Sequence, residues 1–313
     1  MSAPPGVSVI IVSFNTRELT LRAVESALRQ KGVEVDVWVV DNASEDGSAK
    51  AVQEAFPEVK VLALDENVGF GAANNLAMDE ASGRFFLLLN SDARLQGEED
   101  LRVMVEALEA DSRAGALGPR LENEEGVLEY SARRFPTVSA EFLRRYQLFR
   151  LMPKEARSRK FLLEFFDHGS RTEADWITGA CMLVRREAYE AVGGLDPDIF
   201  MYGEEREWCW RIREAGFGIV FDPRITVIHA RGASSPGRAV WRIRQGFKAD
   251  LQFARERGGK LYQIAFWLVR LGGLVVEAVL FGLSSSLGRG GAMSERARAA
   301  RLELKSWVSL PVG

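Results

Sequence analysis

The chain contains 313 residues, of which 47% are hydrophobic and 27% are charged, and this composition is typical of a folded globular protein. The length allows one large domain with an appended segment, or two domains. A formal net charge of −3 gives no reason to expect a nucleic-acid partner. Two cysteines, Cys181 and Cys209, are too few for a disulfide scaffold or a cysteine-rich zinc site, so we expect a reduced, cytosolic setting.

The first apolar run, residues 7–12 (VSVIIV), follows no positive charge and is too short for the core of a signal peptide, so we expect no secretory export. The same β-branched run predicts a strand buried on both faces of a parallel sheet. A helix should follow it and end before Gly32, with Thr16 as a candidate N-cap. Further strands are expected at 35–40, 59–64, 85–89 and from 116, and further helices at 48–56, 72–80 and 101–109. This alternation predicts a doubly wound α/β sheet, in which ligands bind beyond the carboxyl ends of the strands.

The second half of the chain departs from this alternation. Residues 133–171 mix aromatic and basic side chains and indicate an excursion from the sheet. The core then resumes in an apolar stretch at 176–184, a helix at 204–215 and two short strands at 219–221 and 225–228. We therefore expect an α/β domain over residues 1–234 and a helical segment over residues 235–313.

Two carboxylates, Asp41 and Asp92, lie at the carboxyl ends of predicted strands, where the sheet would bring them to one edge. Either one alone is equally well explained as a cap of the following helix or turn, but the shared placement favours a site. Asp92 would suit a divalent cation, because carboxylate oxygens are ligands of Mg²⁺ and Mn²⁺. His229 follows another apolar strand and is a second candidate ligand, with an ordinary packing histidine as the alternative.

Residues 202–207 (YGEERE) place three carboxylates in the first turn of a predicted helix. The helix dipole stabilises ionised carboxylates there, so ordinary helix-end chemistry is one explanation. The alternative is that one of them is a general base for an acceptor hydroxyl. Other chemistries lack their motifs: the chain has no GxxxxGK loop and no GxSxG elbow, and residues 67–74 do not follow a strand as a dinucleotide-binding loop would. Hydride transfer and acyl hydrolysis are therefore poorly supported.

Together these segments resemble the family-2 glycosyltransferases of GT-A fold, especially the rhamnosyltransferase-like branch that builds bacterial surface polysaccharides. The resemblance spans residues 7–234 and implies a mixed α/β sheet flanked by helices, with a C-terminal helical extension. It is carried by 9–15 (VIIVSFN), 40–48 (VDNASEDGS), 67–71 (NVGFG), 89–92 (LNSD), 176–180 (WITGA), 200–205 (FMYGEE) and 229–232 (HARG).

The resemblance also implies roles for individual residues. Asp41 would hydrogen-bond the pyrimidine ring of a nucleoside diphosphate sugar, and Asp92 and His229 would bind Mg²⁺ or Mn²⁺ bridging the diphosphate. Glu205 aligns with the expected general base, and Glu204 lies beside it. The residues implied to bind the nucleotide sugar are Ser13, Asn15, Asp41, Asn67, Gly69, Asn90, Ser91, Asp92, Trp176 and Gly179.

Two positions depart from the family pattern. Asn90 stands where the first Asp of the metal motif often stands, which leaves fewer anionic ligands. Glu205 stands where the base is usually Asp, so Glu204 and Glu207 remain alternatives for that role.

The implied reaction is a single displacement with inversion, in which the base takes the proton of an acceptor hydroxyl as its oxygen attacks the anomeric carbon. The implied donor is a dTDP- or UDP-linked sugar, for example dTDP-rhamnose. The acceptor would be a saccharide, free or lipid-linked, in cell-surface polysaccharide biosynthesis. The alternative function is a catalytically silent nucleotide-sugar-binding subunit of a polysaccharide assembly complex.

Residues 261–283 form an apolar segment that is long enough to cross a bilayer as a helix. Gln263, Arg270 and Glu277 recur in it every seven residues and would line one stripe. A core helix against the catalytic domain, a helix at the membrane interface and a spanning helix all remain open. Basic residues that would suit anionic head groups precede it: Arg238, Arg242, Arg244, Lys248, Arg255, Arg257 and Lys260. We expect a cytoplasmic protein with a peripheral contact at the inner face of the plasma membrane as one placement.

Overall fold

The computed structural model describes residues 6–161, 165–230 and 239–286. The chain divides into two compact units. The sheet unit consists of Met1–Arg134 and Leu162–Pro236, and the helical unit consists of Phe135–Phe161 and Gly237–Gly313. Most of the expected 133–171 excursion therefore belongs with the C-terminal segment and not with the sheet.

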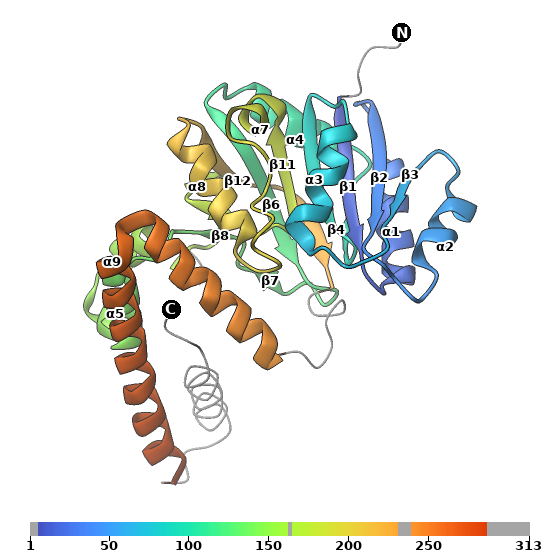
Figure 1. Ribbon diagram of the computed structural model, residues 1–313. Helices are drawn as coiled ribbons and strands as arrows, with labels where there is room; N and C mark the ends of the chain where they lie inside the picture. Colours follow the sequence, from blue (N-terminus) through green and yellow to red (C-terminus); the bar gives the residue numbers. More distant parts are fainter. Residues whose placement is uncertain (1–5, 162–164, 231–238, 287–313) are drawn as a thin grey trace. The chain divides into compact units, whose positions relative to one another are not determined.

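The sheet unit alternates strands and helices as the periodicity predicts (Figure 1). Its first part contains β1 (Val7–Ser13), α1 (Arg17–Leu28), β2 (Val35–Asp41), α2 (Ser48–Ala55), β3 (Lys60–Ala63), α3 (Phe70–Glu80), β4 (Phe85–Asn90), β5 (Ala93–Leu95), α4 (Asp100–Glu109), β6 (Ala114–Glu122), β7 (Leu128–Glu129) and β8 (Ala132–Arg133). Its second part contains β9 (Thr172–Ala174), β10 (Trp176–Ile177), β11 (Cys181–Arg185), α7 (Arg186–Val192), α8 (Glu204–Glu214) and β12 (Gly218–His229).

The main sheet has the strand order β3-β2-β1-β4-β11-β6-β12-β5. Strands β3, β2, β1 and β4 are parallel, β11 runs antiparallel between β4 and β6, and β12 pairs parallel with β6. The predicted doubly wound mixed sheet is thus confirmed. Because β1, β2, β4 and β12 run in the same direction, their carboxyl ends lie along one edge.

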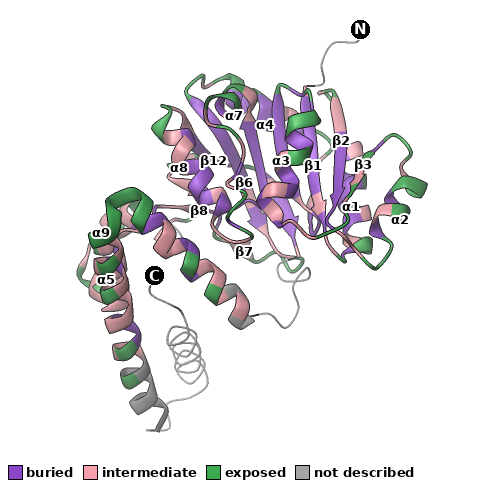
Figure 2. Cartoon of the chain, viewed as in Figure 1, coloured by how far each residue is buried: buried purple, intermediate pink, exposed green. Residues whose placement is uncertain are grey.

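Each face of the sheet carries its own core, since successive side chains of a strand point to opposite faces. Val9 and Ile11 of β1 pack with α1 and α4 on one face. Ile10 packs with α3, α7 and α8 on the other. The central strands are buried along their length (Figure 2). This burial on both faces explains why the sequences of these strands are continuous apolar runs.

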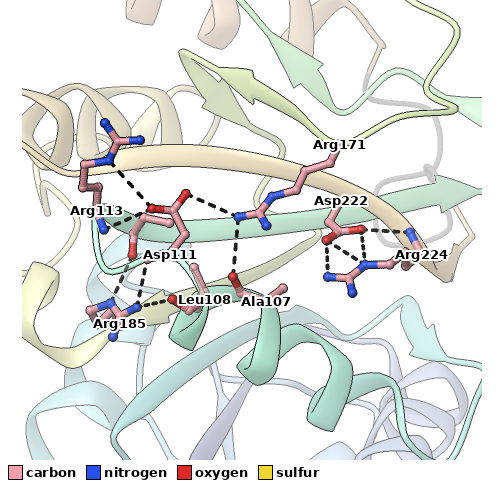
Figure 3. A network of polar contacts seen from close by, with 9 residues as sticks. Ala107, Leu108, Asp111, Arg113, Arg171, Arg185, Asp222 and Arg224 are labelled. Carbon is pink, nitrogen blue, oxygen red and sulfur yellow. Dashed lines mark hydrogen bonds and ion pairs between the residues drawn. The ribbon is translucent and has the colours of Figure 1, made fainter.

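One local prediction, that of two separate strands before His229, is wrong. The short strands expected at 219–221 and 225–228 are one strand, β12, with a register shift between Asp222 and Thr226. At this irregularity, buried Asp222 accepts hydrogen bonds from Nε and Nη2 of Arg224 (Figure 3).

Thr16 stands at the N-cap position of α1, as predicted, but its side chain makes no capping hydrogen bond. Its buried hydroxyl lies 3.0 Å from Ser91 Oγ instead. The carboxylate of Asp46 accepts from the first helical N–H, that of Arg17, at 2.9 Å. A buried hydroxyl needs a partner inside the protein, whereas the helix end is satisfied by a carboxylate from another loop.

Arginines cap the carboxyl end of α4 and tie it to neighbouring segments (Figure 3). Arg185 donates to the carbonyl of Ala114 at 3.1 Å and to that of Leu108. Arg171, the residue before β9, donates to the carbonyl of Ala107 and to Asp111, each at 3.5 Å. Cations at the carboxyl end of a helix are favourable, so this cluster anchors the start of β9 to α4.

The helical unit contains α5 (Val138–Arg145), a 3₁₀ turn η1 (Leu148–Leu151), α6 (Lys154–Phe161) and α9 (Ala239–Ser286). Gly259, with φ of 73°, interrupts α9 and divides it into two arms. Within the described residues, one stretch, Ile243–Glu277, is long and apolar enough by length and composition to cross a membrane. The interruption at Gly259 lies inside that stretch.

Candidate active site

Strand register brings the predicted site residues to one edge of the sheet. Asp41 at the end of β2 is paired with Ser13 at the end of β1, and Asn90 at the end of β4 is paired with the residue before Ser13. Asp41 and Asn90 are therefore separated by two strand spacings, roughly 10 Å, and Asp92 follows Asn90 in the loop after β4. This separation suits a ligand with a ring at one end and a diphosphate at the other.

Asp41 presents an unused carboxylate oxygen at this edge. The side chain is buried, and its Oδ2 accepts from the backbone N–H of Ser44 at 3.1 Å. Its Oδ1 has no hydrogen-bond partner among the described residues. A buried acceptor without a donor is unfavourable, so Oδ1 is well placed to receive an N–H from a bound molecule.

Two other predicted nucleotide-binding side chains are engaged within the protein. Asn15, at φ of 54°, accepts from the N–H of Glu45 at 2.8 Å through Oδ1, and its own N–H donates to Ser44 Oγ at 2.9 Å. Ser13 lies in the buried hydroxyl cluster, 2.9 Å from Thr20 Oγ1. These residues brace the loops after β1 and β2, and their side chains do not point freely toward a ligand.

The loop after β3 is held by Asn42, which the sequence analysis did not assign to the site. Asn42 accepts from the N–H of Val68 at 2.9 Å and donates to the carbonyl of Gly69 at 3.2 Å. Asn67 accepts from the N–H of Gly69 at 3.0 Å. A Cβ on Gly69 would lie 2.5 Å from the carbonyl oxygen of Phe200, so this loop packs directly on the segment that leads into α8.

Asp92 and His229 lie side by side, as the candidate metal pair requires. His229 ends β12, which pairs antiparallel with β5 immediately after Asp92, and the N–H of Ala230 donates to the carbonyl of Asp92 at 2.8 Å. His229 Nε2 lies 3.3 Å from Asp92 Oδ1, and both side chains are buried. Both explanations of His229, a metal ligand and a packing histidine with satisfied hydrogen bonds, are consistent with this arrangement.

Glu129 on β7 contacts the other ring nitrogen of His229, and no motif in the sequence pointed to Glu129. Its Oε2 lies 2.8 Å from His229 Nδ1. Burial lowers the pKa of His229, but the hydrogen bonds and charges of Asp92 and Glu129 outweigh it and raise that pKa to about 9. A cation bound at Nε2 must displace a proton, so metal binding should strengthen as the pH rises.

The pair fits a divalent cation geometrically. In an octahedral shell with ligands at ~2.1 Å, neighbouring ligand atoms lie about 3 Å apart. The 3.3 Å between Asp92 Oδ1 and His229 Nε2 therefore allows both to occupy adjacent positions around one ion. Across the described parts of the chain, no three His, Cys, Asp or Glu side chains are arranged so that all of them could hold one metal ion. The remaining ligands would come from a bound diphosphate and water.

The three carboxylates at the start of α8 have different surroundings. Glu204 is buried, its Oε2 has no hydrogen-bond partner within the described chain, and burial together with the charge of Glu205 raises its pKa well above 4.5. Glu207 accepts two hydrogen bonds from Arg211 at 2.6 and 2.7 Å. Glu205 is half-buried and accepts from the N–H of Gly203 at 3.2 Å. Glu205 is thus the carboxylate best able to accept a proton from an outside molecule.

Residues 176–180 place Gly179 next to Glu205 and next to the end of β4. A Cβ on Gly179 would lie 3.5 Å from Glu205 Cβ and 3.7 Å from the ring of Phe70. The next residue, Ala180, accepts through its carbonyl from the N–H of Asn90 at 2.9 Å. This stretch therefore links the end of β4, next to Asp92, to Glu205.

Trp176 lies on β10, just before these residues. Its ring is flanked by the guanidinium groups of Arg133 and Arg206, at 4.9 and 5.8 Å from the ring centre. Its Nε1–H donates to the carbonyl of Arg134 at 3.1 Å. Trp176 is thus held within the sheet unit by cation–π contacts and a hydrogen bond.

A profile of the family described as Glycosyl transferase family 2 matches residues 8–193, which include the ends of β1, β2, β4 and the 176–180 segment. The chain belongs to glycosyl transferase family 2. It is 30% identical over 215 residues to the N-acetylglucosaminyl-diphospho-decaprenol L-rhamnosyltransferase of Mycobacterium tuberculosis, covering 65% of this chain and 69% of that one. It is also 30% identical over 172 residues to rhamnosyltransferase WbbL of Escherichia coli, covering 51% of this chain and 60% of that one.

Solved structures show the same fold. The mannosyltransferase PcManGT from Pyrobaculum calidifontis, in complex with GDP-Man and Mn²⁺, has a TM-score of 0.62 at 18% identity and covers 98% of this chain and 87% of its own. GalNAc-T7 with UDP, GalNAc and Mn²⁺ has a TM-score of 0.54 at 16% identity, covering 80% of this chain and 48% of its own. The fold of this glycosyltransferase is therefore GT-A, as the sequence motifs predict.

Proposed function

We propose that this family-2 glycosyltransferase is an inverting, metal-dependent enzyme that moves a sugar from a dTDP- or UDP-linked donor to a saccharide or lipid-linked acceptor. The observation that carries the proposal is the Asp92–His229 pair at 3.3 Å, at the same edge of the sheet as Asp41. The names of the relatives, rhamnosyltransferases and proteins of O-antigen and succinoglycan biosynthesis, support a rhamnosyl donor such as dTDP-rhamnose and a role in cell-surface polysaccharide biosynthesis.

Each group has one task in this proposal. Asp41 accepts the ring N–H of uracil or thymine through its unused Oδ1. Asp92 and His229 hold Mg²⁺ or Mn²⁺, which when bound offsets the negative charge that develops on the departing diphosphate. Glu205 takes the proton of the acceptor hydroxyl while the bond from that oxygen to the anomeric carbon forms. The bond from the anomeric carbon to the diphosphate breaks on the opposite face, so the configuration inverts.

The two cysteines support the cytosolic setting expected for such an enzyme, because Cys181 and Cys209 are both free and buried. The silent-subunit alternative rests on Asn90, which takes the place of a carboxylate at the metal loop. The alternative predicts donor binding without turnover.

A thermal-shift screen of the full chain against UDP- and dTDP-sugars, with and without Mn²⁺, tests binding, because a ligand of the folded state raises the melting temperature. Product formation from each binding donor, with a free saccharide acceptor, then tests transfer, and NMR of the anomeric proton reports inversion. Absence of binding by every pyrimidine donor would overturn the proposal. Binding without transfer or hydrolysis would establish the silent subunit instead.

A further inference from the structure

The polar side of the second arm of α9, residues 260–286, faces α5 and the first arm of α9. The polar stripe consists of Gln263, Arg270 and Glu277. Arg270 pairs with Asp250 of the first arm and lies 3.7 Å from Glu141 of α5, and Glu277 pairs with Arg145 of α5 at 3.0 Å. The charged side chains of this network are all less than a fifth exposed.

The opposite side of this arm is aliphatic and exposed. The aliphatic stripe consists of Leu261, Ile264, Leu268, Val275 and Val279, which are 83%, 40%, 55%, 46% and 54% exposed. At 100° per residue, these positions lie within about 60° of one another and roughly 150° from the polar stripe. Among the described side chains from 260 to 279, every exposed one belongs to this stripe except Lys260.

The ion pairs determine this orientation. Rotating the second arm to bury the aliphatic stripe within the helical unit would separate Arg270 from Asp250 and Glu277 from Arg145. Each partner would then remain buried without a counter-charge, which is strongly unfavourable. The described part of the helical unit therefore cannot cover the aliphatic stripe, which extends for about 27 Å along the helix at 1.5 Å per residue.

The charges around the stripe indicate what covers it. Lys260 directly precedes Leu261, and Arg255 and Arg257 are exposed on either side of exposed Glu256 at the end of the first arm, so three cations outnumber one carboxylate there. In η1 of the same unit, Leu151 is 84% exposed and Arg150 is exposed beside it. Aliphatic side chains next to cations are the surface that binds the interface of an anionic bilayer.

We propose that the aliphatic stripe of α9 docks the protein on the surface of a bilayer that contains anionic lipids. The helix lies along the interface with the stripe in the acyl boundary and the basic residues at the head groups. The ion pairs of Arg270 and Glu277 within the helical unit favour this placement over a spanning one, because charged groups inside a bilayer are costly. This docking depends on the helical unit alone and not on the transfer reaction.

Flotation of the full chain with vesicles tests the proposal. The wild-type protein should float with phosphatidylcholine–phosphatidylglycerol vesicles and much less with phosphatidylcholine alone. Leu261→Ser/Leu268→Ser should weaken binding by at least about tenfold, because two leucine side chains no longer enter the apolar boundary. The matched control is Leu76→Ser/Val127→Ser, which makes the same kind of change at two exposed aliphatic positions of the sheet unit and should bind as the wild type does.

A fluorescent label gives a second readout that does not depend on the strength of binding. Burial raises the pKa of the Cys181 thiol, and it raises the pKa of Cys209 to about 12, so an added surface cysteine can be labelled selectively. An environment-sensitive dye on Ile264→Cys should shift to the blue with anionic vesicles, and the same dye on Leu76→Cys should not.

Several outcomes would overturn the docking. Equal flotation of wild type and the Leu261/Leu268 double variant would do so, as would a lack of flotation by the wild type. A dimer that becomes a monomer in the double variant, with no vesicle binding, would show that a second copy covers the stripe. Transfer to a soluble acceptor should be the same for the wild type and the double variant, so failure of docking leaves the proposed reaction untouched.

Discussion

Glu129 Oε2 lies 2.8 Å from His229 Nδ1, while His229 Nε2 lies 3.3 Å from Asp92 on the other side of the ring. A carboxylate on one nitrogen fixes the orientation of the imidazole and leaves the other nitrogen for a cation. We therefore propose that Glu129 positions His229 and would not itself be a metal ligand.

Replacing Glu129 by Gln should weaken Mn²⁺ binding by roughly 10- to 100-fold, because the partner that orients the imidazole loses its charge. Titration calorimetry of the full chain with Mn²⁺ measures this directly, without turnover. Glu125→Gln, an exposed position of the same loop, is the matched control and should leave the affinity unchanged. Equal Mn²⁺ affinity in the two variants would show that Glu129 has no positioning role.

Replacing Glu205 by Gln should lower kcat by roughly 100- to 10 000-fold, the usual contribution of a general base, with little change in the KM of the donor. Steady-state transfer assays measure both constants. Glu214→Gln, an exposed position on the same helix, should retain wild-type kcat. Wild-type turnover by Glu205→Gln would assign the base elsewhere.

Glu207→Gln separates the role of the third carboxylate. Because Glu207 is paired with Arg211 in a largely buried contact, the substitution should reduce the free energy of unfolding by about 2 kcal/mol. Thermal and urea unfolding measure the loss, and kcat per folded molecule should stay close to that of the wild type. A catalytic defect without a loss of stability would contradict this assignment.

Asp41→Asn should weaken binding of UDP and dTDP by about tenfold or more, because a charged acceptor for the ring N–H is lost. Calorimetry with each nucleotide provides the measurement. Mn²⁺ binding by the Asp92–His229 pair should be unaffected and serves as the internal control. If UDP binds Asp41→Asn as tightly as it binds the wild type, the pyrimidine does not contact this residue.

Glu204 makes stability depend on pH. Burial and the charge of Glu205 raise its pKa above the ordinary value of 4.5, so the folded state holds a proton that the unfolded state releases. The stabilisation from this proton is complete below pH 4.5 and is lost as the pH rises through the folded-state pKa. The side chain of Glu204→Gln stays neutral at every pH. The melting temperature of the variant minus that of the wild type should therefore increase as the pH rises from 4.5 upward. A constant difference across this range would show that Glu204 ionises normally.

Local patterns were sufficient for much of the fold. The apolar runs ending at Asp41 and Asn90 predicted buried parallel strands, because burial on both faces requires continuous apolar residues. The carboxyl-end rule then placed Asp41 and Asp92 on one edge of the sheet, as the structure has them. Thr16 stands at the predicted N-cap, but its hydroxyl bonds a residue 75 positions away, which no local pattern reveals.

The sequence by itself determined the class of fold, the edge of the sheet where the site lies and the spacing of the polar stripe along the last helix, since each depends on neighbouring residues. Only the tertiary structure decided that Glu129 orients His229, that Arg211 engages Glu207 and that the polar stripe of α9 faces α5. These outcomes depend on strand register and on which buried charges meet across distant segments, because a buried charge must find its partner wherever the chain brings one.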